Sequence, residues 1–316
     1  MRLWLRMLLA VLAVGILFFV WRGLCTDTPE QEPSSAETVD MTSEPAADAP
    51  VKKSLDQEQL LTGIRQCMEK NPTNYAVYVE FPDTEYPPLI WQSKPMRSAS
   101  LIKVFLLAKV MDMEKEGRLQ QNQLLTITEK ERVGGAGSLC GRPAGSRISL
   151  QDVLYLMITE SDNTATNMII DLIGMAEVNL YIQQQGYSDT RLQRCMMDQK
   201  AAAAGRENYT SVRDLGLFFH RLCHGQCVGG DYDRQMIEIL LQQTDRECFP
   251  TALPQARIAH KTGELAGLYD DAGIIYAPAA NYILCIMDDH MDSRTENLQT
   301  MRAIASYVGA FAGSEL

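Results

Sequence analysis

The stretch Pro95-Met-Arg-Ser-Ala-Ser100-Leu-Ile-Lys103-Val-Phe-Leu-Leu107 sets a serine and a lysine three residues apart at the start of a strongly apolar segment. The apolar run predicts a buried helix over residues 101–116. Because a helix N-terminus carries unpaired N–H groups and a partial positive charge, Ser100 would find an oxyanion site in its own backbone. Lys103 falls on the same helical face, and a partly desolvated lysine with a lowered pKa can accept the serine proton. We predict Ser100 as a nucleophile and Lys103 as its general base; a helix cap beside a solvated lysine is the structural alternative.

A second polar string, Ser161-Asp162-Asn163, falls between two helical patterns at 150–158 and 165–173. A loop at this place can aim a hydroxyl and an amide into a cleft. We expect Ser161 to relay a proton to a leaving nitrogen, and Asn163 to hydrogen-bond a substrate amide. All three residue types also cap helices well, so the structural alternative is an N-cap. Both interpretations hold together if Asp162 serves structure.

The third string, Lys261-Thr262-Gly263, closes a predicted strand. Lys261 can supply positive charge for a substrate carboxylate and Thr262 a hydroxyl, while Gly263 lets a substrate approach the backbone closely. The N–H group of Glu264 would be the second oxyanion donor, beside that of Ser100. An ordinary strand end with glycine at the turn is the structural alternative for this string alone.

The wider pattern predicts an α+β domain, with strands near both ends and helices between and beside them. The expected strands are 74–81, 89–92, 259–262, 272–276 and 282–287, and the expected helices are 54–69, 101–116, 150–158, 165–173, 212–223, 234–243 and 300–311. Terminal strands that flank a helical insert can form one antiparallel sheet packed against a helical lobe. A cleft between the sheet and the lobe is the expected place for a site.

Four segments resemble class A β-lactamases and penicillin-binding proteins: 95–103, Val133-Gly-Gly-Ala-Gly-Ser-Leu139, 157–167 and His260-Lys-Thr-Gly263. The three strings in this order are a signature of that superfamily. The resemblance covers the chain from about residue 54 onward. It implies a five-stranded antiparallel sheet with helices on both faces, plus a helical lobe. It also implies the roles given above for Ser100, Lys103, Ser161, Asn163, Lys261 and Thr262.

The chain departs from that family in the part that frees the acyl-enzyme. Class A β-lactamases carry an E-x-x-L-N pattern that positions the hydrolytic water, and no such pattern occurs here. Asp198 is the best replacement in the corresponding stretch and Glu207 is the next; pairing of Asp198 with Arg194 or Lys200 is the structural alternative. The family's usual arginine near the substrate carboxylate is also absent from residues 270–276. The resemblance therefore implies acylation more strongly than rapid turnover.

The first 53 residues differ in character from the rest. Arg2 and Arg6 precede an apolar run that no small-residue cleavage site follows, so residues 1–25 are expected to be an uncleaved transmembrane anchor rather than a signal segment. Residues 26–53 hold seven acidic residues and four prolines before their first lysine, which predicts a disordered linker. Residues 54–316 are the expected hydrolase domain, monomeric and on the extracytoplasmic side of the cell membrane; secretion is the alternative.

The net charge and the cysteine spacing limit the classes of partner that the protein can bind. A net charge of −11 argues against nucleic acid, whose phosphates need clustered lysine and arginine. The spacing His220-x-x-Cys223-His224-x-x-Cys227 suits one helix face, as a metal site would need, but Gly225 is expected to end the helix. We favour packing, or a disulfide such as one with Cys248, over zinc, and we expect neither a metal nor a cofactor.

These observations together predict a serine hydrolase that forms an acyl-enzyme on Ser100. Hydrolysis of a β-lactam amide is the leading interpretation. The alternatives are a peptidoglycan D,D-peptidase-like hydrolase and an acylation-only penicillin-binding module. The expected partners are a small-molecule β-lactam or a peptidoglycan peptide, and the membrane through the anchor.

Overall fold

The computed structural model describes residues 56–69 and 74–315 of the chain. The expected anchor, the expected linker and Ser54 lie outside the described residues. Within the described ranges, the helices are all too short or too polar to cross a membrane.

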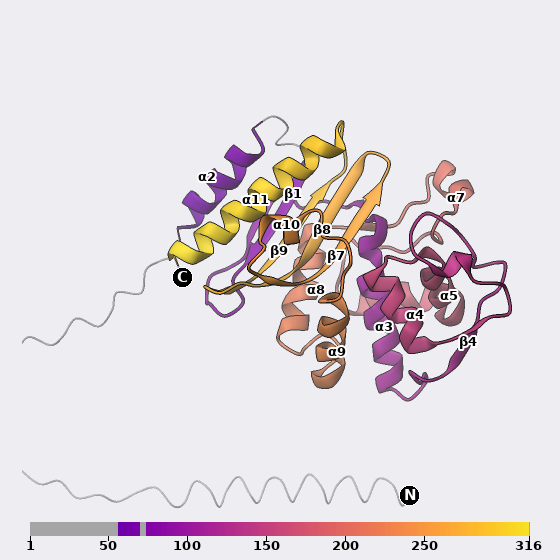
Figure 1. The fold of residues 1–316 in the computed structure, drawn as a ribbon. Helices are drawn as coiled ribbons and strands as arrows, with labels where there is room; N and C mark the ends of the chain where they lie inside the picture. The colour runs from indigo at the N-terminus through magenta and orange to yellow at the C-terminus, as the bar shows by residue number, and fades with distance from the viewer. Residues whose placement is uncertain (1–55, 70–73, 316) are drawn as a thin grey trace, which may run out of the picture. The chain divides into compact units, whose positions relative to one another are not determined.

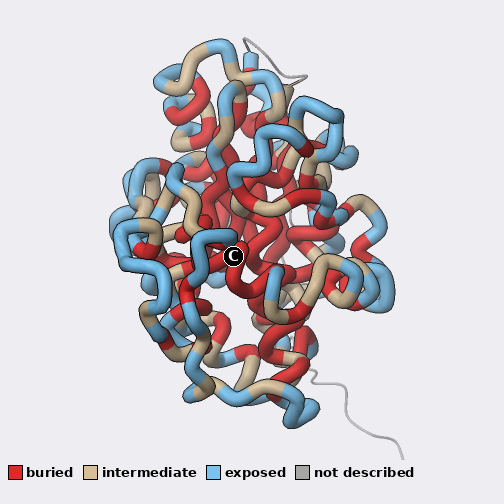
Figure 2. Tube along the Cα trace, turned by 90° about the vertical axis from the view of Figure 1, so that its right-hand side faces the viewer, coloured by how far each residue is buried: buried red, intermediate tan, exposed pale blue. Residues whose placement is uncertain are grey.

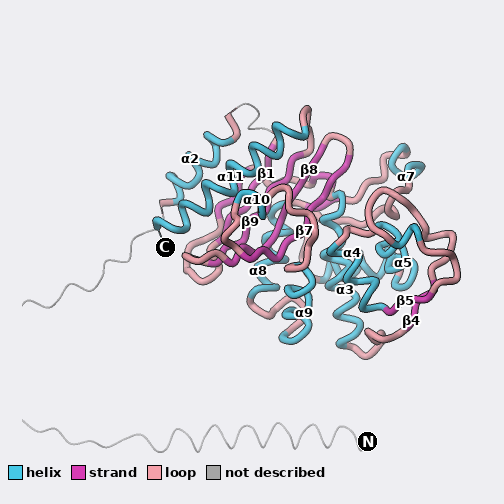
Figure 3. Tube along the Cα trace, in the orientation of Figure 1, coloured by secondary structure: helices cyan, strands magenta, loops and turns pink. Residues whose placement is uncertain are grey.

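The described chain has the predicted α+β architecture, in which each expected strand and helix is present with bounds that differ by a few residues (Figures 1 and 3). The strands are β1 (Tyr75–Glu80), β2 (Leu89–Trp91), β3 (Met96–Arg97), β4 (Leu124–Thr126), β5 (Arg147–Ser149), β6 (Tyr209–Thr210), β7 (Arg257–Leu265), β8 (Leu268–Tyr276) and β9 (Asn281–Asp288). The helices are α2 (Gln57–Cys67), α3 (Lys103–Lys115), α4 (Leu150–Thr159), α5 (Asn163–Ile173), α6 (Met175–Gln184), α7 (Gln199–Ala203), α8 (Val212–Cys223), α9 (Gly230–Leu240), α10 (Phe249–Ala252) and α11 (Arg294–Glu315), with short 3₁₀ helices η1 (Ala99–Ile102) and η2 (Leu139–Gly141).

Five strands form the predicted antiparallel sheet, in the order β2-β1-β9-β8-β7. The order brings the two ends of the domain together, because Tyr78 of β1 pairs with Cys285 of β9. β7 is an edge strand, and its C-terminal part packs against η1. The strand that carries Lys261 therefore lies directly beside the segment that carries Ser100.

Helices cover both faces of the sheet, as the resemblance implied. α2 and α11 lie side by side on one face, where Leu60 and Met301 pack with Val77 of β1 (Figure 1). α8 and the helical lobe cover the other face, where Ala76 joins a second core with residues of α3, α4 and α5. Because successive side chains of a strand point to opposite faces, the whole of β1 is buried. The buried trace fills the interior in Figure 2.

α3 is enclosed on nearly all sides by other elements of the lobe. Phe105 meets Tyr187 and Phe218 edge-on, with ring centroids 5.0 Å and 5.3 Å apart. α8 lies close to the sheet at Gly216, where a Cβ atom would come within 2.4 Å of the Tyr78 ring. This packing gives α3 a fixed position, and the first residue of α3 is Lys103.

Candidate active site

Ser100 lies in η1 and Lys103 begins α3, as the sequence predicted for a serine and a lysine at a helix start. Lys103 is fully buried, so a solvated lysine is excluded. Its Nζ donates to the Ser161 carbonyl oxygen (2.6 Å), to Ser161 Oγ (3.1 Å) and to Asn163 Oδ1 (3.0 Å). The half-buried Ser100 hydroxyl makes no hydrogen bond with any residue that the structure describes.

Ser161 stands in the break between α4 and α5 with a left-handed φ of 53°. Asp162 is the buried N-cap of α5, the structural role that the sequence allowed for it: Oδ1 accepts from the Ala165 N–H group at 2.7 Å. The other oxygen, Oδ2, accepts from the Leu139 N–H group at 2.7 Å. Asp162 therefore fixes both α5 and the glycine-rich segment 133–139 around the Ser161 hydroxyl.

The glycine-rich segment packs directly on Asn163. The Asn163 side-chain amide donates to the Gly134 carbonyl oxygen at 3.0 Å. The backbone N–H group of Asn163 donates to the Ala136 carbonyl oxygen at 3.1 Å. Gly137 has a φ of 90°, and a Cβ atom there would come within 2.3 Å of the Asp162 side chain. Only glycine allows this approach. Asn163 is thus held between Lys103 and Gly134, at the wall of the cavity described below.

Lys261 approaches the same hydroxyl from the sheet. Its fully buried Nζ donates to Ser161 Oγ at 3.0 Å and to the Thr262 carbonyl oxygen at 2.7 Å. Thr262 and Gly263 are buried beside it. A Cβ atom at Gly263 would lie 3.1 Å from Ala99 Cβ, so the missing side chain lets β7 approach η1. The three strings of the sequence therefore meet at the Ser161 hydroxyl.

Burial sets the charge of both lysines. Desolvation lowers the pKa of Lys261 to about 7. The pKa of Lys103 lies well below its ordinary value, first because of burial and then because of the neighbouring charge of Lys261. A neutral amine at Lys103 can accept a proton at ordinary pH, and the Ser161 hydroxyl can pass one between the two lysines.

A cavity of about 590 Å³ opens beside this cluster. Four of the predicted site residues line it: Ser100, Asn163, Asp198 and Glu264. Both residues whose N–H groups were predicted as oxyanion donors, Ser100 and Glu264, are thus on its wall. Sequence reasoning did not identify Arg97 and Met196, which also line it.

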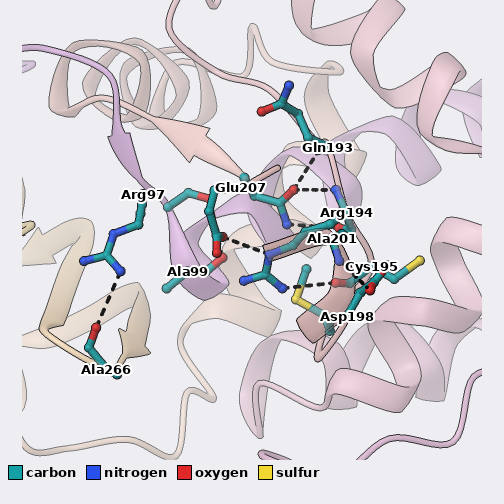
Figure 4. Close-up of polar contacts among 12 residues, drawn as sticks. Arg97, Ala99, Gln193, Arg194, Cys195, Asp198, Ala201, Glu207 and Ala266 are labelled. Atoms are coloured by element: carbon teal, nitrogen blue, oxygen red, sulfur yellow. Dashed lines mark hydrogen bonds and ion pairs between the residues drawn. The ribbon is translucent and has the colours of Figure 1, made fainter. Parts of the chain in front are cut away.

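The loop that carries Arg194 and Asp198 to the cavity is held by side chains that bond its backbone (Figure 4). Asp198 caps the short helix α7, with Oδ1 accepting from the Ala201 N–H group at 2.9 Å. Glu207 is paired with Arg194 at 2.8 Å, so Arg194 is the partner of Glu207 rather than of Asp198. Asn167 of α5 bonds both backbone groups of Met196, at 2.8 Å and 3.2 Å. The backbone of an apolar residue in the cavity wall is thereby fixed.

The histidine–cysteine spacing on α8 does not form a metal centre in the structure. α8 ends at Cys223, with Gly225 two residues beyond, as predicted. His220 bonds Glu80 at 2.6 Å, and the Cys227 thiol lies 3.9 Å from the Tyr181 hydroxyl. Within residues 56–69 and 74–315, no three potential ligands converge on one point and each cysteine is a free thiol. In the structure these side chains make packing and hydrogen-bond contacts, and Cys223, Cys227 and Cys248 are free thiols.

A serine beside a buried lysine, with a bridging hydroxyl and a second buried lysine, is the arrangement found in serine hydrolases that form acyl-enzymes. The chain belongs to the Beta-lactamase enzyme family, whose sequence model matches residues 59–311. This assignment agrees with the resemblance that the three strings carry.

The chain is also similar in sequence and in structure to individual β-lactamases and to PBP-A. The chain is 30% identical over 192 residues to a β-lactamase of Streptomyces albus G, a match that covers 57% of this chain and 60% of that protein. It thus spans less than two thirds of that relative's length. Among solved structures, a β-lactamase from Sphaerobacter thermophilus superposes with a TM-score of 0.75 at 24% identity, over 82% of this chain and 98% of that one. PBP-A gives a TM-score of 0.74 at 28% identity, over 80% and 96%.

The buried position of Lys261 predicts a pH-dependent cost to stability. Lys261 is charged in the folded and unfolded states below pH 7 and neutral in both above about pH 10.5, so its burial destabilises the fold most at low pH. We expect Lys261→Met to raise the free energy of unfolding relative to the parent at pH 6, and this gain to shrink by roughly 2–4 kcal/mol on going to pH 10. Denaturant unfolding at both pH values measures it, with the exposed Lys200→Met as control. A gain that does not change with pH contradicts the burial argument.

Proposed function

We propose that this chain is a serine hydrolase that a β-lactam amide acylates on Ser100. The observation that carries the proposal is the Ser161 hydroxyl, which accepts from both Lys103 and Lys261 beside a cavity lined by Ser100. Two buried amines on one hydroxyl are costly to charge, and their lowered pKa values make them useful for moving a proton. The proposal assigns Ser100, Lys103 and Ser161 to the chemistry, and Asn163, Lys261, Thr262, Gly263 and Glu264 to the substrate.

In the proposed acylation, these groups act in the following order. Ser100 Oγ attacks the lactam carbonyl carbon while its proton passes to the neutral Lys103 amine. The N–H groups of Ser100 and Glu264 stabilise the oxyanion. The carbon–nitrogen bond then breaks, and the leaving nitrogen takes the Ser161 hydroxyl proton, which Lys103 replaces. Lys103 returns to its neutral form, so one proton has moved from Ser100 to the leaving nitrogen.

Hydrolysis of the acyl-enzyme needs a base for water, and Asp198 is our candidate. Asp198 lines the cavity and uses only Oδ1 in capping α7, which leaves Oδ2 available to a water molecule. Glu207 lines the same cavity, but its carboxylate is paired with Arg194. Asp198 therefore remains the better candidate of the two.

A second candidate function, acylation without rapid turnover, is favoured by Met196. Asn167 fixes this apolar residue in the cavity wall, where it cannot activate water. A mutant of PBP-A, 28% identical to this chain, has been solved as an acyl-enzyme complex with penicillin-G. This supports acylation by a penicillin. A D,D-peptidase-like reaction would use the same serine on a peptide.

Covalent labelling tests the proposal. Full-length protein treated with a fluorescent penicillin should carry one label, and Ser100→Ala should abolish it because no other group supplies the nucleophile. The exposed Ser188→Ala is the matched control and should label as the parent does. Turnover assays separate the alternatives: turnover of a chromogenic cephalosporin by the parent, measured in parallel, separates a β-lactamase from an acylation-only protein.

Release of terminal D-alanine from a peptide without cephalosporin turnover would favour the peptidase. Absence of both label and turnover contradicts the β-lactam proposal.

The lifetime of the labelled protein tests Asp198. If its carboxylate activates water, Asp198→Asn should extend the half-life of the acyl-enzyme by about a hundredfold or more, with labelling itself little changed. Mass spectrometry of the intact protein after removal of free penicillin follows the decay. Glu207→Gln is the comparison, and its half-life should stay near that of the parent. An unchanged half-life in Asp198→Asn removes Asp198 from the mechanism.

The proposal also places the hydrolase domain outside the membrane, anchored through residues 1–25. The support is the sequence pattern, in which Arg2 and Arg6 precede the apolar run. In cells that express the full-length chain, the protein should stay in the membrane pellet after alkaline carbonate extraction, because an uncleaved spanning helix resists it. The intact mass of the protein should correspond to a chain that begins at residue 1 or 2. Recovery of a shortened chain in the supernatant would establish cleavage and secretion instead.

A further inference from the structure

Two consecutive methionines of the loop at the cavity lie in different environments. Met196 is 7% exposed, and Asn167 bonds both of its backbone groups. Met197 follows it with a left-handed φ of 61° and is 43% exposed. The other methionines within residues 56–69 and 74–315 are all buried or half-buried. Met197 is therefore the described thioether that solvent reaches most easily.

The Met197 side chain closes the space between this loop and the glycine-rich segment 133–139. A Cβ atom at Gly135 would lie 2.9 Å from Met197 Sδ and 3.4 Å from its Cε. The thioether thus occupies the place that a side chain at position 135 would take. The same point lies 2.8 Å from Asn163 Nδ2, so the sulfur and the Asn163 amide are close neighbours.

Small molecules have room to approach this sulfur. Met197 lines the cavity of about 590 Å³ that Ser100 also lines. It lines a second cavity of about 520 Å³ as well, together with Cys195 and Asp171. Each volume exceeds many times the roughly 30 Å³ that a water molecule takes, so hydrogen peroxide fits in both. Because oxidation of sulfur follows exposure, Met197 is favoured over its buried neighbour.

Asn163 is the group on which a change at this sulfur acts. Its Nδ2 has two N–H bonds, of which one donates to the Gly134 carbonyl oxygen at 3.0 Å. The proposed function leaves the other for the substrate amide. A thioether is a weak acceptor and competes little for that N–H bond. A sulfoxide is polar, and its oxygen on Met197 Sδ would be an acceptor beside the Asn163 amide.

We propose that Met197 is an oxidation site, at which hydrogen peroxide slows the proposed acylation reversibly. The sulfur lone pair attacks one peroxide oxygen, an S–O bond forms and the O–O bond breaks. Sulfur loses two electrons, and the other oxygen leaves as water with both peroxide hydrogens. The sulfoxide oxygen then accepts the N–H bond of Asn163 that the substrate needs. The effect on rate rests on the proposed function, whereas the oxidation itself does not.

Peptide mapping and acylation kinetics test the two parts separately. Full-length protein is treated with dilute hydrogen peroxide, and mass spectrometry of its peptides measures sulfoxide at each methionine. We expect Met197 to be oxidised well before Met196. The second-order rate of acylation by a penicillin, followed by intact mass, should then fall about fivefold or more, as for the loss of one hydrogen bond. Treatment with both methionine sulfoxide reductases, one for each epimer, should restore the rate.

Met197→Leu is the matched variant, because leucine keeps an apolar side chain and cannot form a sulfoxide. Peroxide should leave its acylation rate unchanged. Met291→Leu, at a half-buried methionine outside both cavities, should stay as sensitive to peroxide as the parent.

Three results overturn the proposal: oxidation of Met196 ahead of Met197, an unchanged rate once Met197 is oxidised, or an equal loss of rate in Met197→Leu. Failure of the untreated parent to react with penicillin overturns the proposed function and the effect on rate. The peptide map still decides in that case whether Met197 is the oxidation site.

Discussion

Two buried lysines that share one hydroxyl impose the main constraint on this domain. Lys103 and Lys261 both donate to Ser161 Oγ, and neither side chain reaches solvent. Removal of an ammonium group from water costs several kcal/mol, and two like charges repel each other. Burial lowers the pKa of both lysines, and the charge of Lys261 lowers that of Lys103 further, which makes a buried amine available as a base. The surrounding structure must hold these groups together against that cost.

The elements that hold Lys103, Lys261 and Ser161 together come from distant parts of the chain. α3, which is buried along most of its length, holds Lys103, and β7 holds Lys261 by pairing with β8. Ser161 keeps a left-handed backbone that is unfavourable for a serine, because Asp162 fixes the residues after it to α5 and to the segment 133–139. Strain of this kind persists only where neighbouring packing determines the backbone. The two cores on either face of the sheet provide that packing.

Local periodicity predicted the five strands of the sheet and every helix except α6, α7 and α10, and the short motifs carried the resemblance that implied one five-stranded sheet and a shared site for the three strings. The sequence did not predict the part of the cavity wall that is formed by the loop carrying Arg194 and Met196. Met196 is placed by Asn167 of α5, and Arg194 pairs with Glu207 thirteen residues away. Hydrogen bonds from a side chain to a distant backbone leave no periodic signal in the chain. Arg97 was quoted within the first motif without a role, because its contact is with Asp289, which follows β9 far along the chain.

The two halves of the proposed reaction depend on different kinds of structure. The proposed acylation uses Lys103 of α3 and Lys261 of β7, which both hydrogen-bond Ser161 Oγ, and Ser100 of η1, which lines the cavity beside them. Deacylation depends on the loop that carries Met196 and Asp198, where one side chain is apolar and the other already caps a helix. The base available to a water molecule in this cavity, Asp198, is therefore less well positioned than Lys103, the base available to Ser100. Well-packed groups for acylation beside a loop with a single candidate base favour an acyl-enzyme that persists. Under the proposed function, the side chains of Met196 and Asp198 then determine whether this domain behaves as a hydrolase or as a binding protein.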